Sequence, residues 1–430
     1  MTALAPRELA AWPAVAVPRP GLQRPPRFVL QFNVVALMAL LCGLTTMVYV
    51  EWIGRVYVTE LMLLPTALCA LLSARGQRAF ASPVLRSLVL AGVLMLCGYV
   101  LSDLVRETVP KQYLRGWAKS VFQLFDVVCL CIIVSADRRN FWWYCFGTAL
   151  GGIGYLAGVI HEPIGSWKVT YAAPFNLLVL CLSLWLGRRF LPLLLLGAAL
   201  IGLVFDSRAD PALLLVLASI LWARGAQGDR PMALRRFLRR LALPLGIGAL
   251  VFGLIFAATQ ARFGERRNVS SLGRTLSFTL GLRAIAASPV VGYGSWNDNP
   301  VVSKLQQELM LKALGPNAAG SIRNISFSPH SQILQSWYEG GLLAAAFFMV
   351  LLHWLRKGLL DAALRRTLDP LSGLLLYAML SGLWHLFMSP FGGDHRLRIM
   401  LAAAALLVVI GEQQAARSVP QRRVAMRRLP

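Results

Sequence analysis

The chain has 430 residues, 57% of them hydrophobic and 14% charged, and its mean hydropathy of +0.61 excludes an ordinary soluble domain. Basic residues exceed acidic ones by 24. Such an excess is typical of nucleic-acid-binding proteins, but most of these basic residues flank apolar segments, so no nucleic-acid partner is expected. The composition therefore predicts a polytopic membrane protein.

Apolar runs of about twenty residues recur along the chain, and the alternating pattern of barrel strands is not found. The predicted fold class is therefore all-α, a polytopic integral membrane protein. About twelve transmembrane helices are expected. They are predicted at residues 28–50, 52–74, 84–104, 114–135, 140–160, 171–187, 189–205, 210–224, 241–260, 331–355, 370–390 and 397–411.

The first 27 residues are rich in arginine and proline and lack the apolar core of a signal peptide, so 1–27 is predicted to be a cytoplasmic tail. Basic short loops all fall on the same side as this tail, which the positive-inside rule assigns to the cytoplasm. Both termini are therefore expected to be cytoplasmic. The predicted regions are 28–260 with transmembrane helices 1–9, a large outer loop at 261–329, 330–411 with helices 10–12, and a basic cytoplasmic tail at 412–430.

Four polar residues in the fourth predicted span lie at spacings of four, four and three, so they share one helix face. They are Arg115, Lys119, Gln123 and Asp126. Charges at membrane depth are costly, so this stripe is expected to face either a cavity or an internal charge network, and a cavity is favoured. Arg55 and Glu60 in the second span could pair with these residues or with each other.

A tight outward turn, Asp206 to Pro211, is expected between two spans, with Asp210 as helix N-cap. It holds Arg208 at the outer surface. The guanidinium of Arg208 could form a local salt bridge, or it could present two parallel donors to a phosphate.

The outer loop is predicted to be structured, with helices at 272–287 and 301–314 joined by the turn-rich segment 288–294. Eight basic residues in this loop stand against three acidic ones, Glu265, Asp298 and Glu308, an excess of five. Contact with lipid headgroups or with an anionic ligand would explain that excess.

A histidine is predicted at the membrane surface where this loop meets the tenth span. Ser328 is expected as the N-cap, Pro329 as the first helical residue, and His330 in the first turn, where the helix dipole favours a neutral imidazole that can accept a proton. At about 100° per residue, His330 shares a helix face with Leu334, Trp337 and Gly341, so a groove below the histidine is expected. Alternatively, His330 only hydrogen-bonds at a helix end.

Motifs for nucleotide hydrolysis and zinc proteolysis are absent from the sequence, and its seven cysteines show no zinc-ligand spacing. No metal and no cofactor are therefore expected. What remains is a candidate base, His330, with guanidinium groups from Arg208, Arg274 and, as a further candidate, Arg283, next to membrane-embedded surface. Such a set suits group transfer from a lipid-linked phosphate, because arginines can stabilise a leaving pyrophosphate while histidine deprotonates the attacking hydroxyl.

The region from about 200 to 345 resembles the O-antigen ligase and polymerase superfamily of bacterial envelope glycosyltransferases. The resemblance depends on His330 followed eleven positions later by Gly341, on the Arg274 helix that ends in the 288–294 segment, and on Ser207-Arg208 at an outer span end. One departure is Phe278, because the family often has leucine four residues after this arginine.

The resemblance implies an inverting, metal-independent transfer of O-antigen polysaccharide from undecaprenyl pyrophosphate to a sugar hydroxyl of the lipid A core. The reaction would take place at the periplasmic face of the bacterial inner membrane. His330 would be the base, and Arg208 and Arg274 would hold the pyrophosphate. Possible further contacts to the two lipid-linked substrates are Arg283, Arg115, Lys119, Trp337 and Gly341.

Other functions fit parts of the same pattern. An O-antigen polymerase or a protein O-oligosaccharyltransferase would share these motifs, although polymerases of the superfamily tend to have two large outer loops and this chain is predicted to have one. A secondary transporter would also have many spans and intramembrane charges. Neither an internal repeat nor paired broken helices, which favour a transporter, is found in the sequence.

Overall fold

A computed structural model describes residues 32–51, 54–161, 163, 167, 170–186, 190–225, 232–295, 299–314, 329–364, 371–393 and 395–426. Of the residues that the structure describes, 83% are helical, which confirms the all-α class. A short antiparallel hairpin of two strands, β1 (Tyr49–Glu51) and β2 (Arg55–Tyr57), accompanies the helices. The predicted tail at 1–27 lies outside the described residues.

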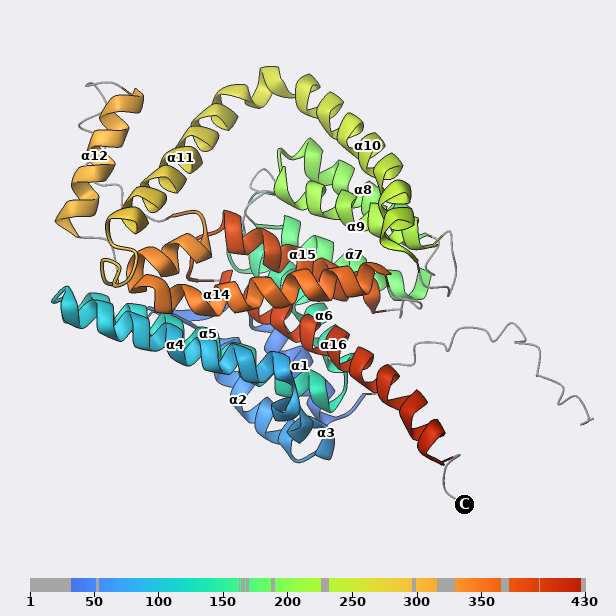
Figure 1. Ribbon diagram of the computed structural model, residues 1–430. Helices are drawn as coiled ribbons and strands as arrows, with labels where there is room; N and C mark the ends of the chain where they lie inside the picture. Colours follow the sequence, from blue (N-terminus) through green and yellow to red (C-terminus); the bar gives the residue numbers. More distant parts are fainter. Residues whose placement is uncertain are drawn as a thin grey trace, which may run out of the picture. The chain divides into compact units, whose positions relative to one another are not determined.

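The order of the helices along the chain can be followed in Figure 1. The N-terminal half contains α1 (Val34–Leu44), α2 (Val58–Leu71), α3 (Ala74–Gln77), the 3₁₀ turn η1 (Arg78–Ala81), α4 (Pro83–Val105), α5 (Pro110–Ala136), α6 (Arg139–Gly158), α7 (Ala172–Leu186) and α8 (Leu191–Val204). The C-terminal half contains α9 (Ala209–Gly225), α10 (Leu234–Ala258), α11 (Gln260–Ala287), α12 (Pro300–Leu314), α14 (Gln332–Leu364), α15 (Ser372–Met388) and α16 (His395–Met426).

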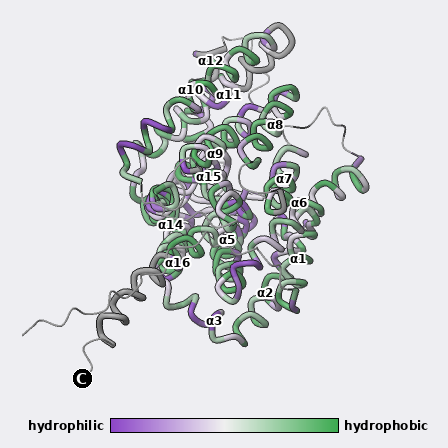
Figure 2. The backbone as a smooth tube through the Cα atoms, turned by 90° about the vertical axis from the view of Figure 1, so that its right-hand side faces the viewer, coloured by the Kyte–Doolittle hydropathy of each residue, from purple (hydrophilic) through white to green (hydrophobic). Residues whose placement is uncertain are grey.

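In the described part of the chain, four helices are long and apolar enough to cross a membrane, namely α4, α5, α10 and α14. A fifth candidate is α2 together with the α3–η1 segment, which bends by 107° at the break between them. Shorter apolar helices include α1, α7, α8 and α15. In Figure 2 the hydrophobic colour dominates most of these helices. The protein is therefore a helical membrane-embedded protein, and the number of about twelve spans stays a prediction.

Several predicted boundaries differ from the structure. The span predicted at 52–74 starts with the hairpin instead, because Glu51 and Arg55 flank Gly54 and this polar stretch turns the chain before α2 begins. A helix was expected to begin at 272 in the outer loop, but α11 is already helical from Gln260. The helices expected at 272–287 and 301–314 are present within α11 and as α12.

The helices that position the candidate site approach one another closely. A Cβ atom on Gly98 of α4 would lie 2.6 Å from the backbone nitrogen of Ala344 in α14, so these two helices touch through their backbones. On its other sides the bundle is completed by α5 against α16 and by α15 against both α14 and α16. Small residues thus allow α14 to lie deep among α4, α15 and α16.

Charged side chains inside the bundle pair with one another. Glu60 accepts hydrogen bonds from the Tyr57 backbone at 2.8 Å and from the Arg396 guanidinium at 2.5 Å, and Asp126 lies beside this pair.

Arg55 pairs instead with Glu51 at the surface. Lys119 forms a second buried pair with Glu339. The polar stripe of α5 therefore faces an internal charge network at Lys119 and Asp126, which is the alternative that the sequence favoured less.

Candidate functional site

The first turn of α14 defines the place of His330. The hydroxyl of Ser331 accepts a hydrogen bond from the Leu334 backbone at 3.3 Å, so Ser331 is the N-cap and the helix begins at Gln332. The expectation that His330 lies in the first helical turn is therefore wrong, and Ser328 lies outside the described residues. His330 directly precedes the cap, with part of its imidazole exposed.

A sharp break at Gly341 divides α14 into two parts. Gly341 has φ 71° and ψ −166°, a conformation that L side chains rarely adopt. The carbonyl groups before the break are satisfied by the 290–294 segment: Tyr293 N–H donates to Tyr338 O at 2.9 Å and Gly294 N–H to Glu339 O at 2.9 Å. Beyond it, Leu342 N–H donates to Val290 O at 3.1 Å. The His330–Gly341 motif and the turn-rich 288–294 segment, both singled out in the sequence, thus bind each other.

Backbone fills the space beside Gly341. A Cβ atom at this position would overlap the carbonyl oxygen of Val290. The lipid groove expected along the face below His330 is therefore occupied at this depth by the 290–294 segment. The conformation and the close contact both explain why glycine stands here.

We expect Gly341→Ala to destabilise the protein by at least about 2 kcal/mol, since it combines a positive φ with a steric clash in a packed region. Gly246→Ala in α10 is a suitable control, because a Cβ atom there would meet nothing within 4 Å. Thermal denaturation of the two detergent-purified variants measures the change in stability that each substitution causes. Equal melting temperatures for Gly341→Ala and wild type would contradict this account of the break.

Side chains from α4 and α14 fix the 288–294 segment from outside. Arg106 donates to Gly292 O at 2.9 Å and to the Ser288 hydroxyl at 2.8 Å, and its guanidinium lies over the Tyr293 ring. Trp337 donates from its indole nitrogen to Pro289 O at 2.8 Å. Trp337, a possible substrate contact from the sequence, is thus half-buried and bonded to this segment.

The C-terminal half of α11 packs against the start of α14 and brings Arg274 toward His330. A hydrophobic cluster that includes Leu280 and Ala284 of α11 and Leu334 and Tyr338 of α14 joins the two helices. Gly281 in α11 faces Pro329 and Leu334 at about 3.7 Å from the position of its absent Cβ. Arg274 precedes Gly281 by seven residues and so lies on the same face, two turns away.

The two candidate site arginines of α11, Arg274 and Arg283, have different surroundings. Arg274 is half-buried and its charge acts on His330, whereas Arg283 is exposed. Nine residues separate them, which at about 100° per residue places them on opposite faces of the helix. The structure therefore brings Arg274, but not Arg283, to the histidine.

Partial burial, the positive charge of Arg274 and the nearby His395 lower the pKa of His330 from its usual value of 6.5. Each of these influences disfavours the protonated imidazolium. His330 is thus neutral at neutral pH and can accept a proton. The predicted neutral state agrees with this environment, although its cause is not the first turn of a helix.

Two further histidines lie near His330. The rings of His385, at the end of α15, and His395, at the start of α16, are 5.2 Å apart, and His385 Nδ1 lies 2.7 Å from the Ser389 hydroxyl. Ser331 ties this region to α14, since its hydroxyl donates to Leu386 O at 3.0 Å. Neither of these histidines is among the site residues expected from the sequence.

Arg208 lies in the turn between α8 and α9, as expected, and is half-buried. Ser207 in this turn donates to Asp210 at 3.2 Å, and Asp210 lies inside α9, which begins at Ala209, so it is not the expected helix N-cap. The guanidinium of Arg398 in α16 interacts electrostatically with both Asp210 and His385. Arg398 therefore links the Arg208 turn to the histidine region, and this residue was missed in the sequence.

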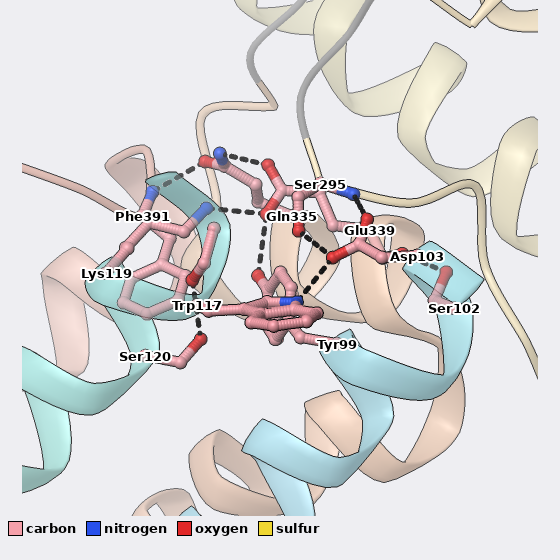
Figure 3. Close-up of polar contacts among 12 residues, drawn as sticks. Tyr99, Ser102, Asp103, Trp117, Lys119, Ser120, Ser295, Gln335, Glu339 and Phe391 are labelled. Carbon is pink, nitrogen blue, oxygen red and sulfur yellow. Dashed lines mark hydrogen bonds and ion pairs between the residues drawn. The ribbon is translucent and has the colours of Figure 1, made fainter. Parts of the chain in front are cut away.

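Below His330, a buried polar network joins α4, α5 and α14 (Figure 3). The Glu339 carboxylate accepts from the Lys119 ammonium at 2.5 Å, from the Tyr99 hydroxyl at 2.6 Å and from the Gln335 amide at 2.7 Å. Gln335 in turn accepts from the Phe391 backbone at 2.6 Å. The network thus anchors the chain between α15 and α16, which leads to His395.

A second set of bonds surrounds Asp103 (Figure 3). Its carboxylate accepts from the backbone nitrogen and the hydroxyl of Ser295, both at 2.6 Å, and from the Trp117 indole at 2.8 Å. Ser102 donates to Glu339 O at 2.7 Å and accepts from Gly294 N–H at 2.9 Å. The 290–295 segment is therefore held by α4, α5 and α14 together.

The remaining candidate site residues differ in burial and in hydrogen bonding. Lys119 is buried in the ion pair with Glu339, whereas Arg115, one turn earlier on α5, is half-buried. Gln332, in the first turn of α14, has a fully buried amide without a hydrogen-bond partner among the described residues. A buried amide usually has such a partner, so the hydrogen-bonding groups of Gln332 are unsatisfied within the described residues.

Glu339 could have been noticed in the sequence, because a carboxylate within an otherwise apolar helix requires a partner. Among the residues that the structure describes, no group of three or more His, Cys, Asp or Glu side chains could hold a metal ion. No protein-family model matches the chain, and a search of curated proteins found no significant similarity. The site must therefore be interpreted from its geometry and its sequence motifs.

Proposed function

We propose that this protein is an inverting, metal-independent glycosyltransferase of the bacterial inner membrane. It moves O-antigen polysaccharide from undecaprenyl pyrophosphate to a sugar hydroxyl of the lipid A core at the periplasmic face, with both termini in the cytoplasm. The observation that supports this proposal is a neutral histidine, His330, held beside a cationic Arg274 at the start of a long apolar helix.

In this reaction His330 acts as the general base. An imidazole nitrogen accepts the proton of the acceptor hydroxyl, whose oxygen bonds to the anomeric carbon of the donor sugar. The bond from that carbon to the pyrophosphate oxygen breaks on the opposite side, which inverts the configuration and releases undecaprenyl pyrophosphate. The protonated histidine then returns its proton to solvent.

The leaving pyrophosphate carries charge that must be stabilised as the bond breaks. Arg274 is near the base, and the turn that contains Arg208 is linked to the same region through Arg398. Guanidinium groups can donate two parallel hydrogen bonds to a phosphate. We assign pyrophosphate binding to Arg208 and Arg274, and contact with the bound substrate to the free amide of Gln332.

Proteoliposomes with the purified protein, a lipid-linked glycan and purified lipid A core test this proposal directly. Formation of a glycan–core product is expected. Cells without the protein should keep long glycan chains on the carrier and make lipopolysaccharide with a bare core. Single repeat units on the carrier or the core would favour a polymerase, and uptake of a solute without transfer would favour a transporter.

The proposal also predicts how activity depends on pH. A general base works only when neutral, so kcat/KM should fall as the pH drops through the pKa of His330, which lies below 6.5. Arg274→Gln removes a positive charge and should move this acidic limb to higher pH. Arg274→Lys keeps the charge, so the limb should stay in place while turnover falls because the two-donor geometry is lost. An unmoved limb in Arg274→Gln would argue against His330 as the base.

A further inference from the structure

A basic cavity of about 940 Å³ lies at the far end of α5 from the histidine site. Its wall includes Arg75 and Arg78 of the α3–η1 segment, Arg138 and Arg139 around the start of α6, and Glu412 of α16. Three segments far apart in the sequence thus meet around it. The α3 and α16 helices can be followed in Figure 1.

Positive charge exceeds negative charge in this cavity. Two carboxylates, Asp137 and Glu412, lie among its four arginines. Glu412 pairs with Arg138 at 2.6 Å, and Asp137 accepts from the backbone of Arg139 at 2.8 Å. In the described part of the chain, the guanidinium groups of Arg75, Arg78 and Arg139 form no ion pair or hydrogen bond. Three cationic groups are therefore available to an anion.

The cavity is separate from the candidate transfer site. Lys119, beside Glu339, and Asp137, in the cavity wall, are eighteen residues apart along α5. At 1.5 Å per residue this separation is about 27 Å, close to the thickness of the hydrocarbon core of a bilayer. A ligand in the cavity therefore cannot contact His330.

Apolar surface adjoins the arginines. Leu72 and Phe80, on either side of Arg75 and Arg78 in the sequence, are 86% and 50% exposed. The wall of the cavity itself contains Val134, Leu407 and Val408. A ligand with a phosphate group and an attached acyl chain fits such a combination better than a free phosphate, because the chain would cover the exposed apolar residues.

We propose that this cavity binds the phosphodiester headgroup of an anionic phospholipid. Arg75, Arg78 and Arg139 contact the phosphate oxygens, and the acyl chains lie against Leu72 and Phe80. The Arg138–Glu412 pair holds α16 against the start of α6 and closes one side of the cavity. This inference does not depend on the proposed glycosyl transfer.

The test uses the full chain purified in detergent, with lipid binding measured by native mass spectrometry and by thermal stability. Phosphatidylglycerol is the probe, and phosphatidylcholine, glycerol 3-phosphate and inorganic phosphate are the comparison ligands. The triple variant Arg75→Gln, Arg78→Gln, Arg139→Gln should bind phosphatidylglycerol about a hundredfold more weakly, since each basic residue near an anionic headgroup contributes about fivefold.

The matched control removes the same charge from the exposed start of α10, with Arg235→Gln, Arg236→Gln and Arg239→Gln. This control should bind as wild type does, and both triple variants should keep the lipid-free melting temperature. Equal weakening in the two triples would show general attraction to basic surface and overturn the proposal. Stabilisation by inorganic phosphate or glycerol 3-phosphate as strong as that by the lipid would also overturn it.

Discussion

His330→Ala is expected to lower the rate of glycan transfer by about 10²- to 10⁴-fold, the contribution of a general base. The melting temperature should stay near that of wild type, because the imidazole is partly exposed and precedes the N-cap of α14 instead of packing within it. Transfer in proteoliposomes and thermal denaturation in detergent provide the two measurements.

His353→Ala is the matched control, since His353 is also an exposed histidine of the α14 segment but lies about six turns further along it. This variant should transfer glycan at the wild-type rate. If His330→Ala lost activity only together with a large drop in melting temperature, the histidine would have a structural role at the helix end, and the proposed reaction would need another base.

Much of the helical framework could be predicted from the sequence, because apolar runs and helix periodicity are local properties. The helix at 300–314 and the helical part of 272–287 are examples. The start of α14 was missed by three residues, since Ser328 and Ser331 are both suitable N-caps and only the tertiary contact between Ser331 and Leu386 favours the second. Local sequence does not contain that information.

Motifs were easier to find than to interpret. The eleven-residue step from His330 to Gly341 suggested a lipid groove, whereas Gly341 provides room for the backbone of Val290. A glycine that admits another segment and a glycine that admits a ligand look the same in one sequence. The partners of Lys119 and Glu60 could not be predicted either, because pairing across the bundle depends on helix positions.

Removal of one partner from the buried pair of Lys119 and Glu339 should strongly destabilise the protein, because it leaves the other charge buried and uncompensated. Their side chains are 6% and 3% exposed, and the ammonium and carboxylate are 2.5 Å apart. Replacing Lys119 with methionine keeps the length of the side chain but leaves Glu339 without its cation. Loss of one partner from a buried pair destabilises proteins by about 3–5 kcal/mol.

The double variant Lys119→Met with Glu339→Gln should recover most of this loss, because it leaves no buried charge and the glutamine can still accept the hydrogen bond from Tyr99. Lys111→Met, at the exposed start of the same helix, should have little effect and serves as control. Thermal denaturation of wild type, of Lys119→Met, of Glu339→Gln and of the double variant gives the coupling between the two residues. If Lys119→Met alone were as stable as wild type, or if the double variant were no more stable than Lys119→Met, the pair would not hold α5 against α14.

Since Gln335 connects Glu339 to the Phe391 backbone, the single variant should also loosen the chain that leads to His395, and hydrogen exchange at 389–393 should rise.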